Sequence, residues 1–182
     1  TIVIHPEPTA DFIPLNDEGC APLYVDFNNT TSLPQGFNDK LFYTWYFGDG
    51  DTSHARFPYH VYSNPGIYTV TLAVRTEFSC YDSIVKVNSI EVFPVPNPAY
   101  TFQVVKFGIY DFKQNATGGV SPYNYYWDFG DGTSSVWSDP RHEFLINQVN
   151  WNQGFNVCLT ITDANGCDST LCDTLNIGAF TL

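Results

Sequence analysis

Two similar ten-residue segments, far apart in the sequence, constrain the fold of this chain more than any other feature. Residues 43–52 read Tyr-Thr-Trp-Tyr-Phe-Gly-Asp-Gly-Asp-Thr, and residues 125–134 read Tyr-Tyr-Trp-Asp-Phe-Gly-Asp-Gly-Thr-Ser. Their tryptophans, Trp45 and Trp127, are 82 residues apart (127 − 45). A repeat of this length is too long for a solenoid unit and suits a small domain. We therefore expect a duplication, with two domains of about ninety residues each.

Each copy has the period-two pattern of a β-strand that runs into a tight turn. Large side chains occupy every second position, so they share one face of the extended segment. These residues are Leu41, Tyr43, Trp45 and Phe47 in the first copy, and Tyr123, Tyr125, Trp127 and Phe129 in the second. We expect both faces to be buried. The Gly-Asp-Gly that follows supplies residues that tolerate positive φ, as a short hairpin turn requires.

Further motifs accompany the two turns. A Pro-x-His-x-aromatic step follows at residues 58–62 and again at residues 140–144, and a Gly-x-Tyr-x-Val-x-Leu strand occupies residues 66–72. In these motifs, and in the Trp-Asp-Phe-Gly-Asp-Gly of residues 127–132, the chain resembles the PKD (polycystic kidney disease) repeat. That family is an immunoglobulin-like β-sandwich. The chain departs from it at Tyr46, which replaces the usual Asp, and at an insertion in the second copy.

Short strands at regular spacing, turn signals between them and no helical periodicity predict an all-β fold. We expect two tandem immunoglobulin-like (PKD-type) β-sandwich domains, over residues 6–94 and 95–178, with a tail at residues 179–182. Residues 1–5 resemble the closing strand of the first domain, so they either end a preceding domain or form an ordinary first strand. Alternate prolines in the link between the domains favour an extended, semi-rigid connection.

Composition excludes some partners and suggests a compartment. The chain has 19 acidic and 7 basic residues, a net charge of −12, which argues against binding to nucleic acid. No apolar run is long enough to span a membrane, and the absence of Met suggests a processed or excised piece. Five cysteines without a Cys-x-x-Cys pair favour disulfides over metal binding. We therefore expect a secreted or cell-surface location.

Two disulfides are predicted on different grounds. Cys158 and Cys172 both have outward parity in the last hairpin, and the intervening turn brings them opposite each other, within reach of a cross-strand bond. The family resemblance implies a second pair, Cys20–Cys80, because PKD repeats with Gly-Cys-Ala-Pro often carry this second cysteine. Immunoglobulin-like topology places those two loops at opposite ends of a sandwich, so an interdomain Cys20–Cys167 link is the alternative.

The Gly-Asp-Gly turns supply the candidate metal ligands. Asp49, Asp51 and Asp131 lie where carboxylates and backbone carbonyls could converge on calcium, which takes six to eight oxygen ligands. Some bacterial domains similar to PKD repeats do hold calcium. Asp in a turn also caps its own backbone amides without any metal. Calcium is the one cofactor that the sequence suggests.

Two tryptophans are candidate interaction residues. Trp151 lies in the amide-rich insertion of the second copy, and Trp137 lies in a Ser- and Asp-rich stretch after the turn. An exposed tryptophan can be a binding hot spot, whereas either ring could instead fold back over the sandwich edge. The expected partners are other proteins or neighbouring repeats of the same chain, with glycans as an alternative.

No catalytic signature is present: the sequence has no Gly-x-Ser-x-Gly, no His-Glu-x-x-His and no phosphate-binding loop. The sequence therefore predicts a protein that is not an enzyme. We expect an extracellular structural and adhesive module that acts as a spacer and interaction array, with many weak contacts summed along the repeats. The alternative is an accessory, carbohydrate-binding region of a secreted hydrolase, because PKD-like domains also flank chitinase, protease and collagenase domains.

Overall fold

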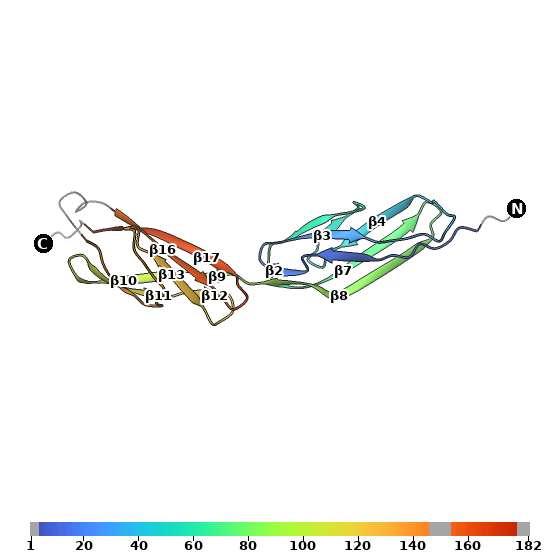
Figure 1. The fold of residues 1–182 in the computed structure, drawn as a ribbon. Coiled ribbons are helices and arrows are strands. Elements are labelled where there is room, and N and C mark those ends of the chain that lie inside the picture. The colour runs from blue at the N-terminus through green and yellow to red at the C-terminus, as the bar shows by residue number, and fades with distance from the viewer. Residues whose placement is uncertain (1–3, 146–153, 178–182) are drawn as a thin grey trace. The chain divides into compact units, whose positions relative to one another are not determined.

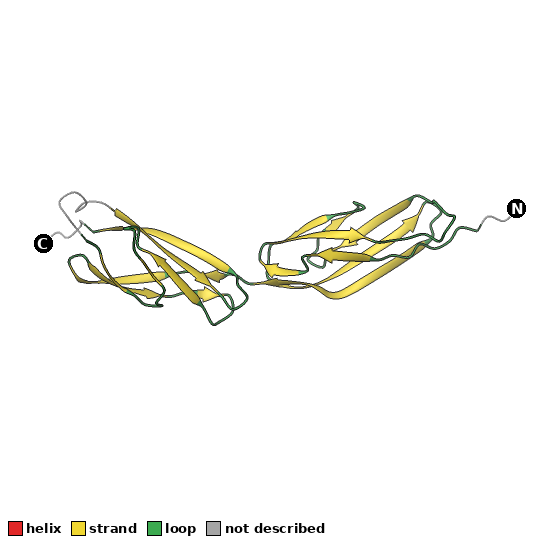
Figure 2. Ribbon diagram, in the orientation of Figure 1, coloured by secondary structure: helices red, strands yellow, loops and turns green. Residues whose placement is uncertain are grey.

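The structure, a computed structural model, describes residues 4–145 and 154–177 (Figure 1). The described residues form strands, turns and loops and contain no helix (Figure 2). The all-β class predicted from the sequence is therefore confirmed. The chain divides into two compact units, Thr1–Phe93 and Pro94–Leu182. Within the described ranges there is no helix with the length and apolar character needed to cross a membrane.

The first unit is a sandwich of two sheets. One sheet has the order β1-β3-β6, formed by Phe12–Leu15, Leu23–Asn29 and Tyr59–Tyr62. The other has the order β2-β8-β7-β4-β5, formed by Glu18–Cys20, Tyr81–Phe93, Gly66–Thr76, Leu41–Tyr46 and Thr52–Ser53. Its paired strands are antiparallel except for β2, which runs parallel to the end of β8.

The second unit repeats this arrangement with small changes. Its first sheet has the order β10-β11-β15, formed by Tyr100–Lys106, Ile109–Gln114 and Arg141–Glu143. Its second has the order β14-β13-β16-β17, formed by Ser134–Ser135, Asn124–Asp128, Gly154–Thr162 and Asp168–Asn176. A short ribbon pairs β12, Thr117–Gly118, with β9, Pro96–Asn97.

A tryptophan lies at the centre of each core. Trp45 and Trp127 are both 0% exposed, so the predicted inward parity is correct for them. Each indole keeps a hydrogen-bond partner, because Trp45 Nε1 donates to the Ala55 carbonyl (2.9 Å) and Trp127 Nε1 donates to the Trp137 carbonyl (3.0 Å). Aromatic rings surround both indoles at centroid distances of 5.1–5.6 Å, the range in which such pairs attract.

One disulfide lies in the last hairpin. Cys158 and Cys172 are directly opposite in the β16–β17 ladder and are joined, with an S–S distance of 2.04 Å. Alternation along the two strands determines this position, because both cysteines lie on the sheet face that points away from the core.

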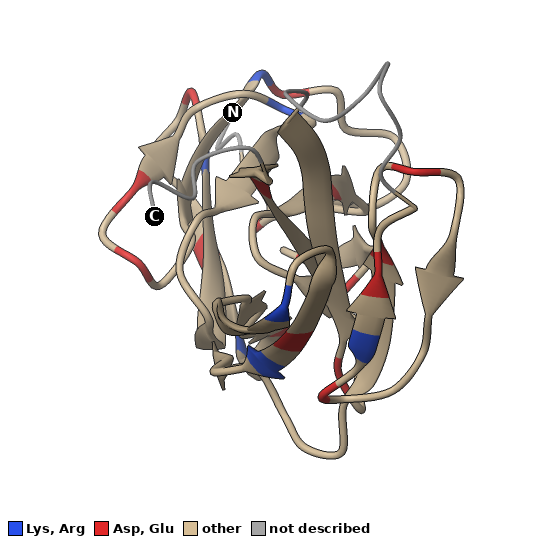
Figure 3. Cartoon of the chain, turned by 90° about the vertical axis from the view of Figure 1, so that its left-hand side faces the viewer, with Lys and Arg blue, Asp and Glu red and all other residues tan. Residues whose placement is uncertain are grey.

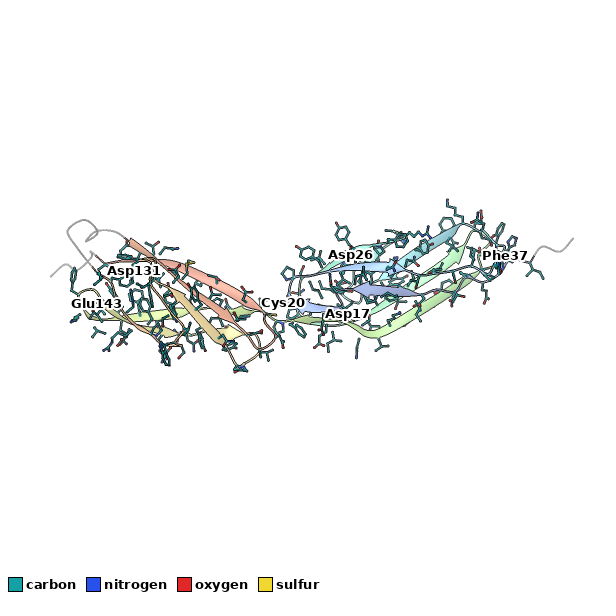
Figure 4. The ribbon with its side chains drawn as sticks, viewed as in Figure 1. Asp17, Cys20, Asp26, Phe37, Asp131 and Glu143 are labelled. Atoms are coloured by element: carbon teal, nitrogen blue, oxygen red, sulfur yellow. A yellow bond between two sulfur atoms is a disulfide. The ribbon has the colours of Figure 1, made fainter. Side chains whose placement is uncertain are left out.

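The predicted Cys20–Cys80 pair is wrong, because Cys80 carries a free thiol. Cys20 pairs with Phe93 at the end of β8, whereas Cys80 directly precedes the start of the same 13-residue strand. Such a strand spans about 40 Å, far beyond the roughly 7 Å over which two cysteine Cα atoms can be bridged. Figure 4 shows Cys20 and Phe37 at opposite ends of the first unit. The turn before Cys80 lies at the Phe37 end, because Glu77 N donates a hydrogen bond to the carbonyl of Lys40, three residues after Phe37 (3.0 Å).

Some predicted features fall outside the described residues. Of the possible strand at residues 1–5, only Ile4 and His5 are described, and neither is in a strand. The tail at residues 179–182 and the candidate interaction residue Trp151 also lie outside the described ranges.

Candidate functional site

The Gly-Asp-Gly segments form the turns that join β4 to β5 and β13 to β14. In the first turn Phe47 N donates to the Asp51 carbonyl at 3.2 Å, and in the second Phe129 N donates to the Thr133 carbonyl at 3.2 Å. The first glycine of each turn lies against a strand of the same sheet. A Cβ at Gly48, where φ is +91°, would lie 2.6 Å from the Thr69 carbonyl oxygen. The turn therefore requires glycine for its backbone angle and also for space.

Two alanine substitutions separate these requirements. We expect Gly48→Ala to lower the free energy of unfolding of the first unit by about 2–4 kcal/mol, because a positive φ and a backbone clash are added together. Gly50→Ala is the matched control, since Gly50 has a φ of +105° but no atom within 4 Å of its Cβ position. It should cost about 1 kcal/mol. Urea denaturation measures both, and equal losses would show that the contact with Thr69 is unimportant.

The aspartate of each turn contacts a histidine of the opposite sheet. Asp49 Oδ1 accepts a hydrogen bond from Asp51 N (3.1 Å), and Asp49 Oδ2 accepts one from His60 Nε2 (2.6 Å). Because a carboxylate only accepts, the proton lies on the histidine nitrogen. His60 belongs to β6, so the contact joins the two sheets of the sandwich. Its side chain is only 10% exposed.

The second unit repeats this contact. Asp131 Oδ1 accepts from Thr133 N (3.0 Å) and from the Thr133 hydroxyl (2.6 Å), and Asp131 Oδ2 accepts from His142 Nε2 (2.8 Å). Figure 4 labels Asp131 within the second unit. The histidine rings also stack on the phenylalanine that precedes each Gly-Asp-Gly turn, His60 on Phe47 at 4.2 Å and His142 on Phe129 at 3.8 Å between centroids. We call each Asp-His-Phe group the inter-sheet clamp.

The clamps favour ionised aspartates. Burial raises the pKa of Asp49, but the hydrogen bonds from His60 and the Asp51 amide outweigh it, so this pKa lies below its ordinary value. Burial likewise raises the pKa of Asp131, and the hydrogen bonds from Thr133 and His142 more than reverse that effect. A carboxyl with a lowered pKa in the folded state contributes stability above its unfolded pKa, and this stability is lost as the pH falls through the folded pKa.

Removal of one clamp carboxylate tests this assignment. We expect Asp131→Ala to destabilise the second unit by about 1–3 kcal/mol at pH 7, because the His142 and Thr133 donors lose a half-buried charged acceptor. The difference from the wild type should shrink once the pH falls below the ordinary aspartate value of 3.8, where protonation weakens the wild-type clamp as well. Asp168→Ala, an exposed carboxylate of β17, is the control and should have almost no effect. A loss that is independent of pH would contradict the assignment.

The clamp also bears on the predicted calcium ligands. Asp49, Asp51 and His60 place three ligand atoms within 4.8 Å of one another. However, Asp49 Oδ2 and His60 Nε2 are 2.6 Å apart, which is a hydrogen-bond distance. These atoms bond to each other, and Asp131 is engaged in the same way in the second unit. Calcium binding at these turns stays a prediction, which melting with and without calcium would test.

The candidate interaction residue Trp137 is 75% exposed. Its backbone has a structural role, since its carbonyl accepts the hydrogen bond from the buried Trp127 indole. Its ring is therefore on the surface while its main chain is held against the core.

Two contacts were not predicted from the sequence. The Asp-His pairing carries a signal that could have been used, because the separation is 11 residues in both copies. The second contact is made by Asp128, at the position where the first copy has Tyr46. Asp128 Oδ1 accepts a hydrogen bond from Gly130 N (2.9 Å). Tyr46, at the corresponding place in the first unit, cannot make this turn contact.

The comparison with protein families agrees with the motifs. Residues 5–92 match the family model described as the PKD domain. Among solved structures, the PKD1 domain of Vibrio anguillarum Epp is 26% identical, with 49% of this chain and 99% of that chain covered and a TM-score of 0.41. A structure of carbohydrate-binding modules from the β-sandwich superfamily is 16% identical, with 96% and 86% covered and a TM-score of 0.44. Murine CEACAM1b is 11% identical, with 94% and 98% covered and a TM-score of 0.34. The family match over residues 5–92, together with the turn motif and the clamp that they contain, shows that the first unit of this chain belongs to the PKD domain family.

Proposed function

We propose that this chain is a non-catalytic extracellular module of tandem PKD-like repeats, which spaces and presents other domains of a secreted or cell-surface protein. The observation that carries this proposal is the path of the chain through each unit. In both units the chain enters at one end of the long strands and leaves at the other. A unit that the chain enters at one end and leaves at the other adds its full length to the distance between the domains before and after it.

The path through the first unit follows from one contact and from the course of β8. The His5 carbonyl, near the start of the unit, lies 3.5 Å from Cys80 Sγ, just before β8 begins. The chain leaves the unit at Phe93, the last residue of β8. Entry and exit are therefore separated by the length of this strand, about 40 Å.

The second unit has the same kind of path. β9, where the chain enters, pairs with β12, and Val120 N, just after β12, donates to Asp163 Oδ2 (2.8 Å). Asp163 begins the turn between β16 and β17. From there β17 runs to Asn176, so entry and exit are separated by about 30 Å.

Further observations support the proposal. A cross-strand disulfide on the outer face of the second unit is typical of proteins in oxidising compartments. The clamps account for the motif residues, because Asp49, His60, Asp131 and His142 all act in folding contacts within the sandwich. The second unit contains the same turn and the same clamp as the first, which supports a tandem repeat of PKD type.

A surface-display experiment tests the proposal. The 182-residue chain is placed between a membrane anchor and an epitope, and the height of the epitope is measured by energy transfer to a membrane dye. We expect the epitope to lie farther from the membrane than in a direct fusion, and removal of either unit to bring it closer. An unchanged height would contradict the spacer role. If the chain is instead an accessory region of a hydrolase, its deletion should leave turnover of a small soluble substrate intact and reduce action on an insoluble one.

A further inference from the structure

The outer face of the first unit carries three rows of side chains across β4, β7 and β8. The ladders place Phe42, Arg75 and Tyr81 in one row, Thr44, Ala73 and Ser83 in the next, and Tyr46, Thr71 and Val85 in the third. Because the middle row is small, the bulky outer rows flank a trough of about 560 Å³. Sites for small ligands have volumes of this size.

Aromatic rings are exposed along this trough. Phe42, Tyr46 and Tyr81 are 41%, 50% and 57% exposed, although each could have been a small polar residue without loss to the core. Four strand positions separate Phe42 from Tyr46, which is about 13 Å. An elongated ligand with flat apolar faces would contact both rows at once.

The lining of the trough contains a guanidinium and no acidic side chain, on a chain that is acidic overall. Its lining includes Arg75 and His54 and no Asp or Glu, although acidic residues outnumber basic ones in the chain as a whole (Figure 3). The Arg75 guanidinium lies 5.5 Å from the Phe42 ring centroid, and among the described residues it forms no ion pair with a carboxylate. Such a guanidinium can bind a carboxylate or a sulfate with two parallel hydrogen bonds.

The polar side chains of the trough suit hydroxyl groups. His54 Nδ1 lies 3.0 Å from the Tyr43 carbonyl, and since a carbonyl only accepts, this nitrogen carries a proton. The Nε2 atom of the neutral ring is then an acceptor. Thr44 and Thr71 add hydroxyls that both donate and accept.

The second unit shows that the fold does not require these residues. Its corresponding rows are Asn124, Thr162 and Asp168, then Tyr126, Thr160 and Thr170, then Asp128, Cys158 and Cys172. The aromatic–cation–aromatic row of the first unit is replaced by polar and acidic side chains, and a tyrosine occupies the middle row. Of these two matching faces, only that of the first unit has the aromatic–cation–aromatic row. The trough of the first unit also includes Tyr46, the residue that departs from the family motif.

We propose that this trough binds an acidic oligosaccharide, whose sugar rings pack on Phe42, Tyr46 and Tyr81 while a carboxylate or sulfate group pairs with Arg75. The C–H groups on the face of a sugar ring carry a partial positive charge, and the negative face of an aromatic ring attracts them. Charge complementarity selects the acidic class, since the lining contributes the Arg75 guanidinium and no carboxylate. This inference goes beyond the spacer role and does not depend on it.

A peptide fits this surface less well. The backbone groups of β4 and β7 are already paired with neighbouring strands, so an extended peptide could not add itself to the sheet over this face. Its own amides would find only side-chain partners. The hydroxyls of a sugar can bond to Thr44, Thr71 and His54 directly.

Calorimetric titration of the full chain tests the proposal with three probes: a galacturonate hexamer, a sulfated heparin hexamer and neutral cellohexaose. We expect at least one acidic probe to bind about tenfold more tightly than the neutral one, and the binding to weaken at high salt. Arg75→Gln should weaken acidic binding about tenfold, and Phe42→Ala should weaken it by a similar factor. Both side chains are on the surface, so an unchanged melting temperature will show that the variants are folded.

Matched substitutions in the second unit serve as controls. Asn124→Ala and Thr162→Ala lie at the positions that correspond to Phe42 and Arg75, and they should leave the affinity unchanged. The proposal is overturned if neither acidic probe binds, if cellohexaose binds equally well, or if Arg75→Gln has no effect. It is also overturned if a polyglutamate peptide competes as strongly as the sugars, since the site would then select acidic peptides.

Discussion

Trp45→Ala is expected to lower the free energy of unfolding of the first unit by about 3–5 kcal/mol, the cost of removing a large aromatic side chain from a closed core. The indole is fully buried and lies 5.1 Å from the Phe12 ring and 5.6 Å from the Phe27 ring. Its deletion leaves a cavity between the two sheets and also leaves the Ala55 carbonyl without its donor. A loss of this size is comparable with the whole stability of a small domain.

The same variant tests the independence of the units. The other tryptophans of the chain, at positions 127, 137 and 151, all belong to the second unit, so their fluorescence reports that unit alone in Trp45→Ala. We expect their urea transition to be unchanged, while circular dichroism shows that the first unit unfolds at a lower urea concentration. Trp137→Ala is the matched control, because its ring is 75% exposed, and it should change stability by less than about 0.5 kcal/mol. A shift of both units in Trp45→Ala would contradict the division of the chain.

Replacement of the hairpin disulfide should have the next largest effect. We expect Cys158→Ser with Cys172→Ser to lower the stability of the second unit by about 2–4 kcal/mol, since the bond closes a loop with a sequence separation of 14 residues and restricts the unfolded chain. Urea denaturation without reductant measures the effect. Cys80→Ser is the control, because Cys80 is a free thiol in the first unit, and it should leave both transitions in place. Equal effects of the two changes would contradict the structural role of the bond.

The sequence predicted those features that follow from local pattern. Strict alternation placed Trp45 and Trp127 inside and Cys158 and Cys172 outside, and the glycines identified the turns. These inferences succeed because side chains in a strand alternate between two faces regardless of the rest of the fold.

Other features depend on contacts between distant segments, and the sequence did not determine them. The prediction of a Cys20–Cys80 disulfide was wrong because it rested on the cysteine pattern of the family and not on a distance in this fold. The two cysteines lie at opposite ends of β8. The Asp49–His60 contact joins two sheets, and only their packing brings the residues together. The trough was missed for a similar reason, since Phe42, Arg75 and Tyr81 come from three strands and meet only through the ladder register.

The most direct test of the account is to stretch single molecules of the full chain by its ends under reducing conditions. If the chain consists of two self-contained sandwiches, each traversed from end to end, unfolding should occur in two separate events. Each event should release roughly 30 nm of chain, since each unit has about ninety residues of up to about 3.6 Å. A single cooperative event that releases roughly twice this length would contradict the account.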